Sequence, residues 1–217
     1  MEKSLSLAEE LLLLALHEEK GTVLMAASMA LPYGLAGALL HELALAGLVR
    51  VEGKHLLAEP RGSTRDELLD EVLAAIRGSE RPRTLNHWIG RFGRSGGKTK
   101  KKLLARLVDK RILGREERRL FWIFPATRYP QADPRPEMRI RREVRDGVLG
   151  YRAPGERAAA LIGLVYACGL VGTAFAKDER REARKRAKAV CEAQPIGKAV
   201  ARAVEMVQAG VIAAASS

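Results

Sequence analysis

The sequence predicts a mainly α-helical protein: one globular helical domain spanning residues 1–217, with short β-hairpins. Three observations carry this prediction. Apolar residues recur at helical spacing in most segments, capping residues precede several of those segments, and the stretches that fit paired strands are only a few residues long. With 217 residues, of which 47% are hydrophobic, the chain is long enough to bury a sizeable core.

Two helices and a hairpin are expected near the N-terminus. Ser6 and Glu9 have the spacing of a capping box, in which each side chain bonds the other residue's backbone N–H, and they predict a helix that runs to about Leu16. A leucine stripe after Pro32 predicts a second helix, which Gly47 ends. The next segment predicts a hairpin with strands at residues 48–51 and 55–58.

Two more helices and a second hairpin are expected in the middle of the chain. Thr64 and Glu67 repeat the capping-box pattern and predict a helix that Gly78 ends. Thr84 suits the cap of a short helix that carries Trp88. Farther along, apolar residues at 112–113 and 120–124 predict the two strands of the second hairpin.

The C-terminal part predicts one loop and further helices. Residues 125–136 contain four prolines and predict a loop, and residues 138–149 predict a basic helix. Residues 158–176 carry no charge and approach the roughly 20 residues of a membrane-spanning helix, but their glycines favour a central helix that its neighbours approach closely. A strongly charged helix at 178–192 and an amphipathic helix at 196–211 complete the chain.

The chain is organised around a basic stretch, Arg91–Arg111, which begins with glycines and lysines and continues as an apolar-striped helix. Lysines at the start of a helix repel one another and oppose the positive end of the helix dipole. A bound anion would resolve this conflict; the alternative is a solvated first turn. The net charge of +12 and the pI near 10.1 also favour a polyanionic partner. The candidate anion-binding residues are Lys98, Lys100, Lys101, Lys102, Arg91 and Arg94.

No catalytic, metal or cofactor site is predicted, and the chain is expected not to be an enzyme. Gly97-Lys98-Thr99 is similar to the end of a phosphate-binding P-loop, but Phe92 occupies the position where that motif requires a glycine. The four histidines lack metal-ligand spacing, and neither cysteine has a base beside it in sequence. The two cysteines and the acidic N-terminal segment indicate a cytoplasmic protein without a signal peptide.

A helix followed by a hairpin is expected twice, over residues 34–58 and 98–124. This arrangement is typical of a winged-helix unit, and a basic winged helix would bind nucleic acid. Aromatic residues make up only 5% of the chain, which argues against stacking platforms for single strands. A winged-helix nucleic-acid-binding protein is therefore the alternative to a protein that binds acidic lipid.

Several short segments occur in an order and spacing typical of one family. They are Leu5–Leu16, Gly34–Gly37, Glu42–Gly47, Leu68–Glu71, Asn86–Ile89, Leu103 with Leu107–Leu113, and Ala174–Ala176. Together they resemble Golgi phosphoprotein 3 and its yeast vacuolar-sorting counterpart, and the chain is similar to the bacterial-type members of that family. The resemblance runs from about residue 5 to residue 210, and the order of the segments is more specific than any one of them.

The resemblance implies a mostly helical single domain that binds phosphatidylinositol 4-phosphate peripherally, at the cytoplasmic face of a membrane. It implies an adaptor and not an enzyme, without a cofactor and without a specific nucleic-acid partner. Eukaryotic members link Golgi membranes to the tails of glycosyltransferases, so a protein cargo is a further implied partner.

The head-group pocket of the family is matched in part. Lys100 matches one of its two basic positions, and the other falls on Gly97, beside Lys98. The arginine position of the family is Ala36 here, and its tryptophan position falls within Ala26–Ala27. The resemblance therefore implies binding of anionic head groups more strongly than it implies the phosphatidylinositol 4-phosphate isomer.

The hairpin of the family carries bulky apolar residues that support membrane insertion or self-association. In the hairpin of residues 112–124, Leu120, Phe121, Trp122 and Ile123 fit this role, and a core strand is the alternative. Because adjacent strand residues face opposite sides, we expect Trp122 to point outward, and Phe121 and Ile123 to face the core.

Overall fold

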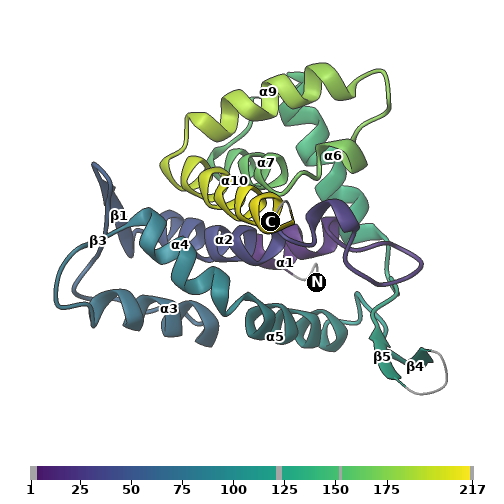
Figure 1. The fold of residues 1–217 in the computed structure, drawn as a ribbon, viewed down its shortest axis with the longest axis horizontal. Helices are drawn as coiled ribbons and strands as arrows, with labels where there is room; N and C mark the ends of the chain where they lie inside the picture. The colour runs from purple at the N-terminus through teal and green to yellow at the C-terminus, as the bar shows by residue number, and fades with distance from the viewer. Residues whose placement is uncertain (1–3, 121–123, 152, 216–217) are drawn as a thin grey trace.

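The computed structural model describes residues 4–120, 124–151 and 153–215, and its helices pack around α2 (Leu31–Leu45) (Figure 1). Ten of the 15 residues of α2 are buried, because helices surround it. It contacts α1 (Leu7–Leu14), α3 (Glu67–Arg77), α4 (Leu85–Arg94), α5 (Gly96–Asp109), α7 (Glu156–Ala167) and α10 (Pro195–Ala215). The prediction of a mainly α, single helical domain with short hairpins is confirmed.

Glycines let the neighbours approach α2 closely. A Cβ added to Gly34 would lie 2.2 Å from Cys168 Sγ, and a Cβ added to Gly37 would lie 2.3 Å from Val200 Cγ2. Both distances are shorter than any van der Waals contact, so a larger residue at either position would push α2 away from its neighbours. In Figure 1, α3 and α5 lie on one side of α2, and α7, α10 and then α9 (Arg180–Glu192) lie on the other.

The predicted capping box at the start of α1 is confirmed. Ser6 Oγ accepts a hydrogen bond from the Glu9 N–H at 3.2 Å, and a Glu9 carboxylate oxygen accepts one from the Ser6 N–H at 2.8 Å. The helix ends at Leu14, two residues before the predicted end, because the chain then turns and Leu16 pairs with Val23 in an isolated bridge. All eight residues of α1 are buried.

The first hairpin is confirmed, and a third strand joins it. Strands β1 (Val49–Glu52) and β2 (His55–Ala58) pair antiparallel, and β2 also pairs with the short strand β3 (Arg83–Thr84). Thr84 caps α4 as predicted, since its side chain accepts a hydrogen bond from the His87 N–H.

The predicted cap of α3 was wrong by two residues. The cap is Asp66, whose Oδ1 accepts hydrogen bonds from the N–H groups of Leu68 and Leu69, and the helix begins at Glu67. Thr64 precedes the cap, and its hydroxyl donates to the Asp66 carbonyl at 2.9 Å. Asp66 also forms an ion pair with Arg106 of α5, described below.

The second hairpin lies farther along the chain than predicted. Its strands are β4 (Glu116–Leu120) and β5 (Phe124–Arg128), so the strands predicted at 112–113 and 120–124 were wrong. Ile112 and Leu113 are buried in the core and therefore belong to the body of the protein. The loop predicted over residues 125–136 is shorter, because residues 125–128 lie within β5 and a helix begins at Arg135.

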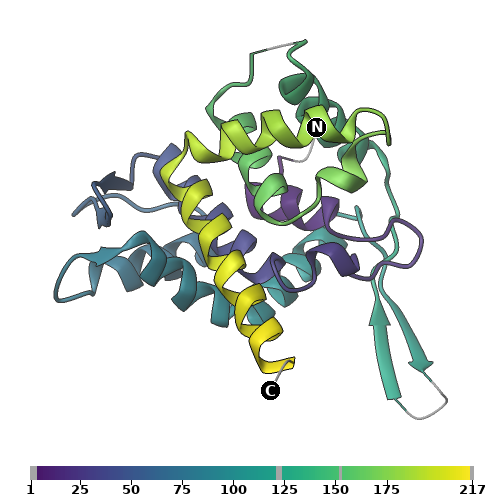
Figure 2. The same cartoon turned by 45° about the horizontal axis from the view of Figure 1, so that its top comes forward.

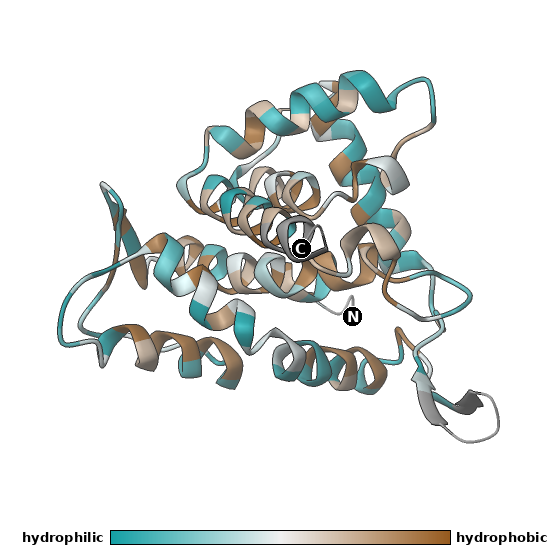
Figure 3. Ribbon diagram, viewed as in Figure 1, coloured by the Kyte–Doolittle hydropathy of each residue, from teal (hydrophilic) through white to brown (hydrophobic). Residues whose placement is uncertain are grey.

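The uncharged segment 158–176 is not one helix. It divides into α7 and the short helix α8 (Val171–Ala174), separated at Gly169, which has a positive φ of 72°. Two further helices, α6 (Arg135–Leu149) and α9, pack against α7 on its outer side. Figure 3 shows that α9 is mostly hydrophilic, whereas α1 and α2 are mostly apolar or neutral.

Among the helices in the described ranges, none combines the length and the apolar character that a membrane span requires.

Candidate anion-binding site

The first turn of α2 packs against the last turn of α4 and the first turn of α5. A Cβ added to Gly96 would lie 2.6 Å from Pro32 Cβ, and a Cβ added to Gly93 would lie 2.5 Å from Tyr33 Cδ1. These two glycines are therefore required by the contact between the helices. Gly97, next to them, is exposed, and a Cβ added there would meet nothing within 4 Å.

The start of α5 has no side-chain cap. Ser95 precedes the helix, but its hydroxyl donates a hydrogen bond to the Phe92 carbonyl at 2.9 Å. Main-chain bonding begins with the Lys98 N–H, which donates to the Ser95 carbonyl at 2.9 Å. Gly96 and Gly97 are the first two residues of α5, at the positive end of its dipole. Free N–H groups at the positive end of a helix dipole favour a nearby anion.

Three of the predicted lysines have no acidic partner among the described residues: Lys98, Lys100 and Lys101. Lys98 and Lys101 are exposed, one turn apart on the solvent side of α5. Lys100 is half-buried, because it lies on the helix face that also carries Leu103 and Leu107. We call these three residues the α5 lysine cluster.

Lys102, the fourth predicted lysine, forms an ion pair. Its Nζ lies 2.5 Å from Glu71 Oε1 on α3. Two later cations on the same stripe of α5 are paired as well: Arg106 binds Asp66 with both guanidinium nitrogens, at 2.6 and 2.9 Å, and Lys110 Nζ lies 2.7 Å from a Glu9 oxygen. These ion pairs join α5 to α3 and α1. One side of the basic helix therefore carries paired cations, and the other carries the α5 lysine cluster.

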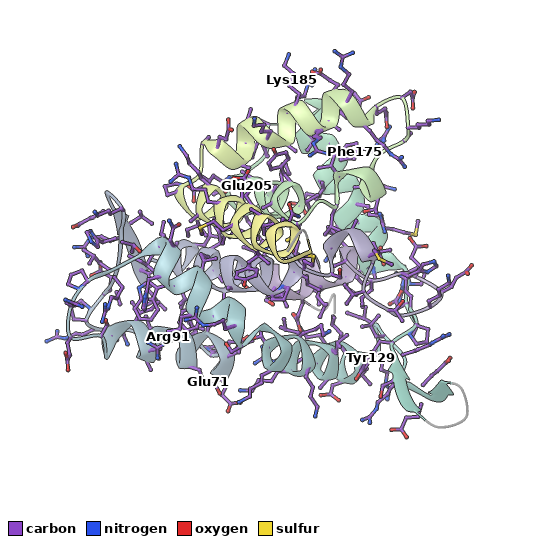
Figure 4. The ribbon with its side chains drawn as sticks, in the orientation of Figure 1. Glu71, Arg91, Tyr129, Phe175, Lys185 and Glu205 are labelled. Atoms are coloured by element: carbon purple, nitrogen blue, oxygen red, sulfur yellow. The ribbon has the colours of Figure 1, made fainter. Side chains whose placement is uncertain are left out.

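Arg91 and Arg94 lie on the exposed face of α4, which leads into α5. The Arg91 guanidinium carbon lies 5.3 Å from the centre of the Trp88 ring, a cation–π contact, and Trp88 itself is buried. The pKa of His87 on the same face lies below its ordinary value, because of partial desolvation and the positive charges of Arg83, Arg91 and Arg94. Figure 4 shows Arg91 on the side of the molecule where α3, α4 and α5 meet. This face is therefore electropositive.

Two exposed methionines near the start of α2 were missed by the sequence reasoning. Met25, in the 3₁₀ helix η1 (Met25–Ala27), is 90% exposed, and Met29 is 39% exposed. Met29 lies three residues before Pro32, which contacts the first turn of α5. The signal available in the sequence was an uncharged apolar run, residues 23–31, directly before a proline that begins a helix.

The two remaining head-group positions of the resemblance are alanines with different environments. Ala36 is buried, so the structure has no room there for an arginine without displacing its neighbours. Ala26 is exposed and Ala27 is buried. The large exposed side chain beside Ala26 is that of Met25.

Neither a metal cluster nor a reactive thiol is found in the described part of the chain. No group of three or more histidine, cysteine, aspartate or glutamate residues there could hold a metal ion. Burial raises the pKa of Cys168 to about 12 and that of Cys191 to about 11, so both thiols stay protonated at neutral pH. The residues before Gly97 form α4, the helix that the sequence predicts around Trp88, and not a strand.

The structure describes only one of the four apolar hairpin residues, Leu120, and only through its backbone pairing. Phe121, Trp122 and Ile123 lie outside the described residues, and the backbone of Leu120 pairs with that of Phe124 at the end of the two strands. Figure 2 shows β4 and β5 projecting away from the helical body. The orientation expected for Trp122 therefore stays a prediction.

The fold and this corner define a mainly helical protein that presents a cationic surface where two helices begin. Comparison with known proteins agrees with this class. The family model of Golgi phosphoprotein 3 (GPP34) matches residues 7–207, and the chain therefore belongs to the Golgi phosphoprotein 3 family. The chain is also 30% identical over 164 residues to vacuolar protein sorting-associated protein 74 of Eremothecium gossypii. That match covers 66% of the chain and 49% of the relative, so the chain spans about half the length of this relative.

Proposed function

We propose that this chain, as one domain over residues 1–217, is a non-catalytic adaptor that binds anionic phospholipid head groups. The head group is phosphatidylinositol 4-phosphate, and the chain binds it at the cytoplasmic face of a membrane. The observation that carries the proposal is the α5 lysine cluster, three cations without acidic partners around a helix start that has no cap. Membership of the Golgi phosphoprotein 3 family supports the choice of ligand. The name of the vacuolar protein sorting relative supports a protein cargo as the second partner.

The energy of such a contact comes from charge and from apolar insertion together. A lysine near an anionic lipid surface contributes about 1 kcal/mol, so three lysines contribute roughly 3 kcal/mol, which is about a hundredfold in binding. Stable attachment requires a second signal. Met25 supplies an exposed apolar side chain shortly before α2, whose first turn packs against the start of α5. The hairpin with Leu120, Phe121, Trp122 and Ile123 supplies another, through insertion or self-association.

The test is binding to lipid vesicles. The variant Lys98→Ala/Lys100→Ala/Lys101→Ala should bind vesicles that contain phosphatidylinositol 4-phosphate roughly a hundredfold more weakly than the native chain, measured by co-sedimentation over a range of lipid concentrations. The matched control is Arg181→Ala/Arg184→Ala/Lys185→Ala, which removes the same charge from exposed positions of α9.

The control should bind as the native chain does. Equal binding by the folded α5 variant, or an equal loss in both variants, contradicts the assignment, because binding would then depend on net charge alone. Replacing phosphatidylinositol 4-phosphate with phosphatidylserine of the same total charge tests the choice of head group, which requires weaker binding to phosphatidylserine.

Duplex DNA provides the comparison with the winged-helix alternative. Each phosphate contact steepens the fall of the logarithm of the binding constant with the logarithm of salt concentration by about 0.9. We expect DNA binding that is independent of sequence and is lost near physiological salt. A sequence-dependent complex that persists at that salt concentration contradicts the lipid proposal.

A further inference from the structure

A groove of about 470 Å³ lies on another part of the surface, away from the α5 lysine cluster. The turn between β1 and β2, the start of α4 and the junction of α9 with α10 border this groove. In Figure 1 these segments lie near the β1 label. The Leu85 N–H at the start of α4 donates to the Lys54 carbonyl at 3.0 Å, so the hairpin turn is held against the helix. The size of the groove is that of a small-molecule site.

Three cations line the groove without an acidic partner among the described residues. They are Lys54 in the hairpin turn, and Lys198 and Arg202, which lie one turn apart on α10. Like charges at this spacing on a helix repel each other. The acid that borders the groove, Glu192, is bound 3.6 Å from Lys188 Nζ. The groove lining therefore carries a net positive charge, with three cations against one acid.

The start of α10 adds to the positive potential. The helix begins at Pro195, which lines the groove, and its main-chain bonding begins with the Lys198 N–H, which donates to the Gln194 carbonyl at 2.9 Å. The helix dipole places partial positive charge at this end, next to the side chains of Lys198 and Arg202. Because three cations and a helix start surround one small groove, the ligand that suits it is a compact oxyanion and not an extended polyanion.

We propose that this groove is a second anion-binding site, which takes a phosphate monoester. The shared chemistry is a tetrahedral dianion, carried either by a lipid head group or by a soluble phosphate compound. The ten residues of α4 separate this groove from the start of α5, a helix length of about 15 Å, so the two sites are distinct. The observations on this groove are independent of the α5 lysine cluster, and the proposal stands or fails separately from the proposed function.

The experiment measures binding of a phosphate monoester, glycerol 3-phosphate, by isothermal titration calorimetry at constant ionic strength. To exclude binding at the other site, the full chain carries Lys98→Gln, Lys100→Gln and Lys101→Gln in every sample. Adding Lys198→Gln/Arg202→Gln should raise the dissociation constant at least tenfold. The control Arg184→Gln/Lys185→Gln removes the same charge from exposed positions of α9 and should change the constant less than twofold.

A third variant, Lys54→Gln, tests the opposite side of the groove and should also weaken binding. An unchanged dissociation constant in Lys198→Gln/Arg202→Gln, or the absence of saturable binding before that change, overturns the proposal. Equal affinity for an unphosphorylated glutamate peptide overturns it too, because the groove would then recognise acidic peptide. The vesicle comparison uses chains with the native α5 lysine cluster. There, weaker binding of Lys198→Gln/Arg202→Gln to vesicles with phosphatidylinositol 4-phosphate supports a lipid source of the phosphate, and unchanged vesicle binding supports a soluble source.

Discussion

Lys102 Nζ lies 2.5 Å from Glu71 Oε1, although 31 residues separate the two in the chain. This ion pair between α5 and α3 divides the basic stretch in two. Lys102 contributes to the contact between helices, whereas Lys98, Lys100 and Lys101 have no acid beside them in the described residues. Figure 4 places Glu71 at the end of α3 nearest α5.

The first prediction compares two adjacent lysines. Lys101→Ala should weaken vesicle binding about fivefold, since one cation near the lipid surface is lost. Lys102→Ala should weaken it less, because Glu71 already neutralises that charge in the folded protein. Co-sedimentation with the same vesicles measures both. If Lys102→Ala causes the larger loss, the division of the basic stretch described here is incorrect.

The second prediction concerns the hairpin tip. Trp122→Asp should weaken membrane binding or self-association and leave the melting temperature nearly unchanged, because we expect Trp122 to point outward. Phe121→Asp should instead lower the free energy of unfolding by several kcal/mol, as for aromatic residues removed from a core. Thermal unfolding, vesicle binding and analytical ultracentrifugation of both variants test this. The reverse pattern would assign the outward position to Phe121.

The third prediction concerns Asp66, which caps α3 and binds Arg106. Asp66→Ala should lower the free energy of unfolding by about 2 kcal/mol, of which the cap contributes about 1 kcal/mol. Asp66→Asn keeps an oxygen that can cap the helix and loses the charge, so it should cost about half as much. Urea unfolding of the two variants measures the difference; equal costs would show that the cap contributes nothing.

Asp66 also makes the free energy of unfolding depend on pH in the acidic range. Burial alone would raise its pKa, but the hydrogen bonds and charge of Arg106 and the N–H groups of Leu69 and Leu68 hold the pKa below its ordinary value. The folded state therefore binds this proton less readily than the unfolded state, so the contribution is present above the unfolded pKa and is lost as pH falls through the folded pKa. Asp66→Asn should show a shallower loss of stability in that acidic range than the native chain.

The fourth prediction concerns His41, which is buried in α2 with no partner for Nε2 among the described residues. Burial lowers its pKa from 6.5 to about 4. Between these values the unfolded chain takes up a proton that the folded chain excludes, so stability should fall as pH drops from 6.5 to 4, by about 3 kcal/mol in total. Urea unfolding at several pH values measures the slope.

The control for His41 is another histidine. His41→Gln should remove most of this slope, whatever its effect on stability at neutral pH, while replacing the half-buried His17 with Gln should leave the slope in place. A slope that persists in His41→Gln would mean that other groups cause the acid sensitivity.

Much of the fold could be predicted because local chemistry determines it. The capping box of Ser6 and Glu9 and the cap at Thr84 each depend on a side chain bonding an N–H three residues away, which the sequence displays directly. The leucine spacing of α2 likewise predicts a buried helix directly from the sequence. The errors arose where distant contacts choose between local alternatives. Asp66 and not Thr64 caps α3, and Arg106, 40 residues away, holds that aspartate.

The second hairpin shows the same limit. Residues 112–113 have the apolar character of a strand, but they are buried in the core. The first strand of the hairpin begins at Glu116. A short apolar run does not reveal whether it pairs with a neighbour or packs into a distant core, since both remove it from water.

For the site, the sequence by itself determined the positive charge, the helix that carries the lysines and the family to which the chain belongs, because composition, spacing and segment order express these directly. Only the tertiary structure decided which cations of the described residues lack a partner, and it brought Pro32 against the start of α5. The physical reason is that residue type sets the charge of a side chain, whereas an ion pair also requires an acid that the fold brings within reach. The acids that pair with α5 come from α1 and α3, and folding alone sets which lysines they reach.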